Sequence, residues 1–421
     1  METTSRGMPA HLAMALGAAV ICLARSPAQA EPAPPYFALL RQAELTAPRL
    51  AESEANIRAA EGARIQAAVR PNPSVALDAE NIGRGVSYNG LSQEQTTLSV
   101  SQPFEIGGQR AARIGAAGAA LETARAERER IRADFAYDLA VAYVTAELAG
   151  KRAALVMESL ARAQEDERAA QALVNAGREA DLRTVQANAA TTAAEADLES
   201  AQADAAEALI RLSGLVGAPE PFSGVSQSLL DRAGAMPRPA MATAIASAAL
   251  RAAEAARAAA AQRVAVERSR AIPDVTVSLG FRRFAGENAK GVIAGVSVPL
   301  PLFNDNRGNV ASAEGELAAA AARVNAAQLN AEADFRSASV QALAAERRLA
   351  AADQAEQAAG EAYRLARIGY DAGRTPLVEL LAARRNLTDA QLRSLDARGA
   401  RVRAEASIAR LTGRIPFGEN P

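Results

Sequence analysis

The chain has little of the side-chain chemistry on which enzymes depend. It contains one histidine, one cysteine and no tryptophan among 421 residues. His11 and Cys22 both lie within residues 1–30, a segment with the features of a cleaved export signal. Without them the mature chain has no Ser-His-Asp triad, no Cys-His nucleophile, no disulfide and no zinc site made of His or Cys ligands. We therefore expect neither an enzyme nor a bound cofactor.

The amino-terminal segment has the parts of a secretory signal. Arg6, whose charge Glu2 offsets, is followed by an apolar stretch at residues 12–23 and by Ala-Gln-Ala at residues 28–30, a small-X-small cleavage pattern. We predict that residues 1–30 are a signal peptide. Cys22 raises the alternative of a lipoprotein, but Ile21 stands where a small residue is expected before a lipid-bearing cysteine.

An excess of one charge and long apolar runs are also missing. Lys and Arg number 47 against 48 Asp and Glu, a formal net charge of −1, so no basic excess indicates nucleic-acid binding. Beyond the signal no stretch approaches the roughly 20 apolar residues of a membrane-spanning helix. Aromatic residues make up only 4% of the chain, which suits long alanine-rich helices packed closely together. If the exported chain enters a membrane, it must do so with β-strands.

What the chain does have is an internal duplication with a period of about 196 to 200 residues. Matching prolines and Ala-Gly-Arg triplets recur in the same order in both halves: Pro103 and Pro299, then residues 176–178 and 372–374. We predict one unit over residues 31–421, made of two pseudo-repeats at about residues 36–216 and 240–414. A linker at residues 217–239 joins them and contains Pro and Gly, which indicates a loop with one short helix.

Each half predicts helix, strand, loop, strand, very long helix, tight turn and helix. No proline interrupts residues 110–175 or 307–371, and each of these stretches of roughly 65 residues would form a helix about 100 Å long. The flanking helices are shorter, and each pair laid end to end matches that length: residues 36–69 with 178–213, and 240–271 with 374–412. We expect one long rod packed beside two stacked half-rods in each half. An ordinary coiled coil is the alternative.

Four short segments between the helices change from a period of 3.6 to a period of 2. Their apolar positions are Val75, Leu77 and Ala79; Leu98 and Val100; Val275, Val277, Leu279 and Phe281; Val292, Ala294, Val296 and Val298. Each segment has about 9 to 11 residues, the length of a tilted strand that crosses a bilayer. Apolar-out and polar-in alternation is typical of a water-filled membrane barrel, and a soluble hairpin is the alternative. Polar loops at residues 83–90 and 282–290 would join the paired strands.

Four strands cannot close a barrel, because about eight strands are the minimum. An open sheet edge in lipid would leave backbone groups unpaired, so several chains must contribute strands. Two copies would form a narrow barrel filled with its own side chains, whereas three copies would form a pore of twelve strands.

Two sequence stretches carry a family resemblance: VSQPFEIGGQR at residues 100–110 and VSVPLPLFNDNRG at residues 296–308. With the duplication, they make the chain resemble an outer-membrane factor of the TolC type, in the branch that serves cobalt–zinc–cadmium efflux. The resemblance implies a mainly α fold with a β-barrel portion: a trimeric 12-stranded outer-membrane barrel continued by a long antiparallel α-helical tunnel in the periplasm. It also implies a passive exit duct for divalent heavy-metal cations.

The implied partners are two further copies of the chain, a periplasmic adaptor, an inner-membrane RND-type transporter and the lipid of the bacterial outer membrane. No nucleic acid is expected. Alternatives are a drug or type I protein-secretion channel, and a soluble periplasmic coiled-coil adaptor. The cargo cannot be read from lumen residues, because a wide duct passes whatever its pump delivers.

The resemblance also implies roles for the two helix-to-helix turns, which we call the first tip (residues 175–178) and the second tip (residues 370–374). They would form the periplasmic end, where the adaptor docks. The candidate docking residues are Gly177, Arg178, Gly373 and Arg374. Ordinary helix capping is the alternative role of the two glycines, because glycine accepts positive φ.

The same resemblance places an aperture just after the second tip. Glu379 matches the first acidic position of the family's constriction, and a trimer would bring three such carboxylates around one axis. The second acidic position is Ala382 here, which argues against a gate of two rings. Arg374 matches a position that helps to latch the closed tip, with Asp181 as its candidate partner. A solvated or ion-paired glutamate is the alternative for Glu379.

The two Pro-rich stretches would mark the junctions between barrel and tunnel. Proline lacks the backbone N–H that a strand ladder needs, and glycine permits sharp changes of direction. The candidate junction residues are Pro103, Gly107, Pro299, Pro301 and Gly308.

Overall fold

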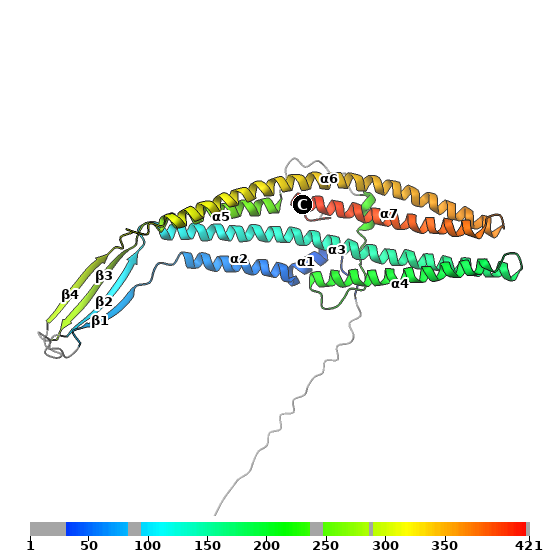
Figure 1. Ribbon diagram of the computed structural model, residues 1–421. Coiled ribbons are helices and arrows are strands. Elements are labelled where there is room, and N and C mark those ends of the chain that lie inside the picture. The colour runs from blue at the N-terminus through cyan, green and yellow to red at the C-terminus, as the bar shows by residue number, and fades with distance from the viewer. Residues whose placement is uncertain (1–30, 83–93, 236–246, 286–288, 418–421) are drawn as a thin grey trace, which may run out of the picture.

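The computed structural model describes residues 31–82, 94–235, 247–285 and 289–417 (Figure 1). The predicted signal peptide, with His11 and Cys22, lies outside the described residues, and so does the predicted loop at residues 83–90. The described chain is elongated, with a small sheet at one end and long helices running away from it (Figure 1).

Seven α-helices and one short 3-10 helix account for most of the described residues. They are α1 (Tyr36–Thr46), α2 (Pro48–Ala67), α3 (Gln109–Asn175), α4 (Leu182–Val216), η2 (Leu230–Ala235), α5 (Ala248–Ser269), α6 (Arg307–Asp371) and α7 (Leu377–Leu411). The long helices α3 and α6 have 67 and 65 residues, which confirms the two predicted rods. In Figure 1, α2, α1 and α4 follow one another beside α3, and α5 and α7 follow one another beside α6. None of the described helices combines the length and the apolar character of a membrane-spanning helix.

The prediction of one unbroken helix over residues 36–69 is wrong. The structure has two helices there, because α1 ends at Thr46 and Pro48 begins α2. Ala47 between them is extended, with φ −69° and ψ 121°. A proline ring disfavours helical geometry in the preceding residue and lacks the N–H for a helix interior, but it is well suited to the first helical position.

The four predicted strands form one antiparallel sheet in chain order: β1 (Ser74–Glu80), β2 (Gln95–Phe104), β3 (Val275–Phe284) and β4 (Ala289–Ser297). The register aligns Leu77, Leu98, Phe281 and Val292 across all four strands. Each of these side chains is at least 50% exposed, whereas Thr97 on the other face is 7% exposed. The alternation of an apolar and a polar face is therefore confirmed.

The predicted loop at residues 282–290 is too long. Residues 282–284 complete β3 and residues 289–290 begin β4. The polar side chains of this segment lie on paired strands because the ladder continues to the pair formed by Phe284 and Ala289. Polarity near a hairpin end therefore does not define where a strand stops.

The two halves meet in a core near the middle of the helices, where buried apolar residues of α1, α3, α4, α6 and α7 form one cluster. Tyr36 of α1 is buried, and its hydroxyl donates to the Ala136 carbonyl of α3 at 2.8 Å. Glu147 of α3 is also buried, and its carboxylate accepts the Leu229 amide at 2.8 Å next to η2. Such bonds satisfy polar groups that burial would otherwise leave without water. They attach the linker and the amino-terminal helix to the long rod.

Candidate functional site

The two tips have the same backbone geometry. Gly177 and Gly373 have φ values of +68° and +69°. The Arg178 amide donates to the carbonyl five residues earlier at 3.0 Å, and the Arg374 amide makes the equivalent bond at 2.8 Å. These are Schellman turns, in which glycine avoids the strain that a Cβ would meet at positive φ. Helix capping thus accounts for both glycines, and contact with an adaptor stays a prediction.

A cavity of about 590 Å³ lies between the two tips of one protomer. Charged and aromatic side chains from both tips and their helices line it: Arg178, Glu179, Tyr370, Asp371 and Arg374. The guanidinium of Arg178 approaches within 3.6 Å of the place where a Cβ on Gly373 would lie. The structure therefore brings Arg178, Gly373 and Arg374 together on one surface.

The candidate aperture residues lie at this same end of the protomer. Glu379 is exposed in the first turn of α7, and Arg374 and Asp181 are also exposed. Within the described residues of one protomer, no ion pair joins Arg374 to Asp181. A latch or an acidic ring that forms around the axis of a trimer stays a prediction.

A buried ionic cluster joins three helices close to the tips. We call it the Asp166 cluster, and it consists of Asp166, Arg367 and Arg384. Asp166 of α3 is fully buried. Its two carboxylate oxygens accept from Arg367 of α6 at 3.0 Å and from Arg384 of α7 at 3.1 Å. Burial raises the pKa of Asp166, and the two guanidinium groups oppose that shift. Burial also lowers the pKa of Arg384. The cluster ties the α3–α4 hairpin to the α6–α7 hairpin.

The Asp166 cluster was not predicted from the sequence, although α7 carries a signal for it. Arg384 occupies a position of the apolar stripe that includes Leu377, Leu380 and Leu387, and it is buried like them. A charged residue at a core position of a helix needs a buried partner. Asp166 similarly lies between buried Ala163 and Ala170 on α3. Only the fold shows that the two positions meet.

The predicted junction residues lie where the sheet passes into the helices. Pro103 lies in β2 opposite Thr276, and Pro299 and Pro301 follow the end of β4. A Cβ on Gly107 would lie 2.5 Å from the Cβ of Ile272, so a larger residue would force the two halves apart. Gly308 is the second residue of α6.

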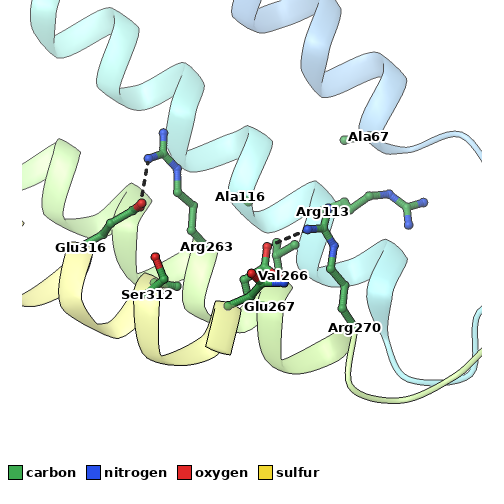
Figure 2. A pocket seen from close by; sticks show the side chains of 11 residues that line it. Ala67, Arg113, Ala116, Arg263, Val266, Glu267, Arg270, Ser312 and Glu316 are labelled. Atoms are coloured by element: carbon green, nitrogen blue, oxygen red, sulfur yellow. Dashed lines mark hydrogen bonds and ion pairs between the residues drawn. The ribbon is translucent and has the colours of Figure 1, made fainter. Parts of the chain in front are cut away.

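A polar pocket of about 500 Å³ lies among the helices on the helix side of this junction (Figure 2). Two ion pairs are drawn in it: Arg270 with Glu267 at 2.7 Å and Arg263 with Glu316 at 3.8 Å. A third arginine, Arg113, is paired with Glu105. The arginines that line this pocket are therefore balanced by acidic residues of the same protomer.

The sequence profile described as outer membrane efflux protein matches residues 39–218 and 243–414. This chain belongs to the outer membrane efflux protein family. It is 47% identical to the nickel-cobalt-cadmium resistance protein NccC of Alcaligenes xylosoxydans xylosoxydans, over 96% of this chain and 92% of that protein. It is 45% identical to the nickel and cobalt resistance protein CnrC of Cupriavidus metallidurans, over 96% of both chains.

Solved structures agree with this membership at the level of the fold. The crystal structure of the outer membrane protein VceC from Vibrio cholerae matches with a TM-score of 0.73 and 23% identity, over 90% of this chain and 96% of that one. The resemblance to the TolC type of the metal-resistance branch is thus confirmed. As a member of this family, the protein lies in the bacterial outer membrane and its helices extend into the periplasm. The family is one of efflux proteins, and the alternative of a soluble adaptor is set aside.

Proposed function

We propose that this protein is the passive exit duct of a tripartite efflux pump that exports divalent heavy-metal cations. Three copies would close a barrel of twelve strands, and their helices would continue it as a periplasmic tunnel. The observation that carries the proposal is the open sheet. In the described residues β1 and β4 each pair on one side only, and one face of the sheet is apolar and exposed.

Edges of this kind require partners in a membrane. In hydrocarbon, each unpaired backbone N–H or C=O group costs several kcal/mol, about as much as a buried polar group that has no hydrogen-bond partner. Pairing β4 of one copy with β1 of the next removes both edges. The exposed apolar rows would then contact lipid, and the polar face would line a water-filled lumen.

The proposed cargo follows from the relatives, whose names describe resistance to nickel, cobalt and cadmium. The cation is a passing substrate in this proposal. Selection would occur at an inner-membrane transporter of the RND type, to which a periplasmic adaptor would connect the duct. The adaptor would dock at the tips through Gly177, Arg178, Gly373 and Arg374.

The tip would also control conduction. A ring of three Glu379 carboxylates would attract cations and bind a divalent ion weakly. Arg374 and Asp181 would latch neighbouring protomers in the closed state. Because all three side chains are exposed within one protomer, they are free to make contacts between protomers.

Deletion and complementation test the function. A deletion strain should lose tolerance to nickel, cobalt, zinc or cadmium, and expression of the intact chain should restore it. A drug panel grown in parallel separates the metal duct from a drug duct. Unchanged metal tolerance together with drug sensitivity would refute the metal assignment. Recovery of the protein from the periplasm without detergent would refute the duct.

A further inference from the structure

Two basic side chains face each other at the hairpin end of the sheet. The register places Arg283 of β3 directly opposite Lys290 of β4. Both are exposed and lie on the apolar face, in the row that follows Phe281 and Val292 toward the β3–β4 hairpin. Within the described part of the chain, neither has an acidic partner. We call this pair the basic hairpin pair.

The neighbouring arginine, Arg282, differs from this pair because it has partners within the protein. Arg282 lies on the opposite, polar face, where its Nε donates to the Thr97 hydroxyl at 2.9 Å. Its guanidinium also lies 3.6 Å from the Glu80 carboxylate. Two consecutive arginines thus point to opposite faces, and among the described residues Arg282 has an acidic partner whereas Arg283 has none.

Like charges directly opposite on a sheet repel each other, so the basic hairpin pair destabilises the free strand pair. An anion between the two side chains would remove this repulsion. Cross-strand Cβ atoms lie about 4.5–5.5 Å apart, a spacing that lets a guanidinium and an ammonium reach one phosphate together. The side chains would extend along the apolar surface and place their charges at the membrane interface.

The position of the pair identifies which interface this is. The described ends of β3 and β4 that carry the pair lie at the end of the sheet away from the helices (Figure 1). Since the helices extend into the periplasm, the hairpin end of a barrel faces the cell exterior. The described strands contain neither Trp nor Tyr, the residues that usually anchor a membrane protein at an interface. Basic residues are the other common anchors.

We propose that Arg283 and Lys290 bind the phosphate groups of an anionic glycolipid in the outer leaflet of the outer membrane. Each barrel would carry three such sites on its outer surface, one for each protomer. The inference rests on the proposed barrel, in which the apolar face of the sheet is turned to lipid. It adds a specific lipid contact that the duct itself does not require.

The test measures retention of diphosphorylated lipid A by the full chain purified in detergent. We expect the intact protein to retain this lipid after gel filtration and to retain fully dephosphorylated lipid A much less. Arg283→Gln and Lys290→Gln should each weaken binding about fivefold, and the double variant about 25-fold, because each basic residue near an anionic surface contributes similarly. Arg283→Lys should retain most of the binding.

Arg282→Gln is the matched control, because it removes an adjacent arginine from the other face. The proposal is overturned if the double variant retains as much diphosphorylated lipid A as the intact protein. It is also overturned if Arg282→Gln weakens retention as strongly as Arg283→Gln. Should the double variant not assemble, the two single variants decide the outcome by the same comparison.

Planar-bilayer conductance separates this inference from the duct. If the intact protein conducts and the double variant retains the lipid, the lipid site is wrong and the duct stands. If the intact protein forms no conducting trimer, the duct itself fails. Loss of lipid by a double variant that still conducts supports both.

Discussion

At the sheet end of the protomer large apolar side chains are exposed, whereas at the tip end charged side chains are buried. Phe281 is 64% exposed, and the whole Asp166 side chain is covered. In the proposed barrel, lipid and the strands of neighbouring copies cover this sheet end. The tip end is held together inside one protomer by the Asp166 cluster. The two ends therefore depend on different interactions, and substitutions should separate them.

The largest effect should follow from Asp166→Ala. It leaves Arg367 and Arg384 without their shared carboxylate, and breaking a buried ion pair costs about 3–5 kcal/mol. Hydrogen exchange of the tip helices should become much faster, while the barrel strands stay protected. The tip should also open more readily, which raises conductance in planar bilayers.

Asp371→Ala is the control for this substitution. Asp371 also pairs with Arg367, at 3.4 Å, but its side chain is 59% exposed. Exposed ion pairs contribute little to stability because water and salt screen them. Equal exchange rates in the two variants would show that the Asp166 cluster does not hold the hairpins together.

A charge placed on the apolar face of the sheet should have the next largest effect. Leu98→Arg faces the proposed lipid side, where arginine at the bilayer midplane costs about 2–4 kcal/mol. The amount of heat-resistant trimer in isolated outer membranes should fall. Ser101→Arg, on the opposite face of the same strand, should still assemble and should alter ion selectivity instead. Assembly lost equally in both variants would contradict the assignment of the two faces.

The smallest effect on folding should come from Glu379→Ala, because this side chain is exposed. Thermal unfolding should hardly change. The block of single-channel currents by divalent cations should weaken, since three carboxylates would leave the proposed ring. Glu361→Ala, which removes an exposed glutamate of α6, should leave the block unchanged. Identical traces for Glu379→Ala and the intact protein would remove this residue from the aperture.

Much of the fold could be predicted because its signals are local. The absence of proline between residues 110 and 175 allowed one very long helix, and α3 has the predicted end at Asn175. Alternation at Leu98 and Val100 identified β2. Glycines 177 and 373 marked the turns because few other residues accept positive φ. The broken first helix was also readable, since Pro48 stands in the sequence.

The contacts that hold the tips were not predictable in the same way. Asp166 is separated from Arg367 by 201 residues and from Arg384 by 218. Helical periodicity shows that each lies in an apolar stripe, but it does not state which stripes face each other. The candidates Glu379, Arg374 and Asp181 came from a resemblance, and the contacts proposed for them would join different protomers.

By itself, the sequence determined the elements and their faces, because periods of 3.6 and 2 and the special backbone demands of Pro and Gly act over a few residues. It also shows that residues 31–421 contain neither His nor Cys. The tertiary structure alone decided which charges meet. Hairpin register set Arg283 against Lys290, and hairpin packing enclosed Asp166 between two arginines. Both depend on the relative placement of whole elements, which burial and strand pairing select over long separations in the chain.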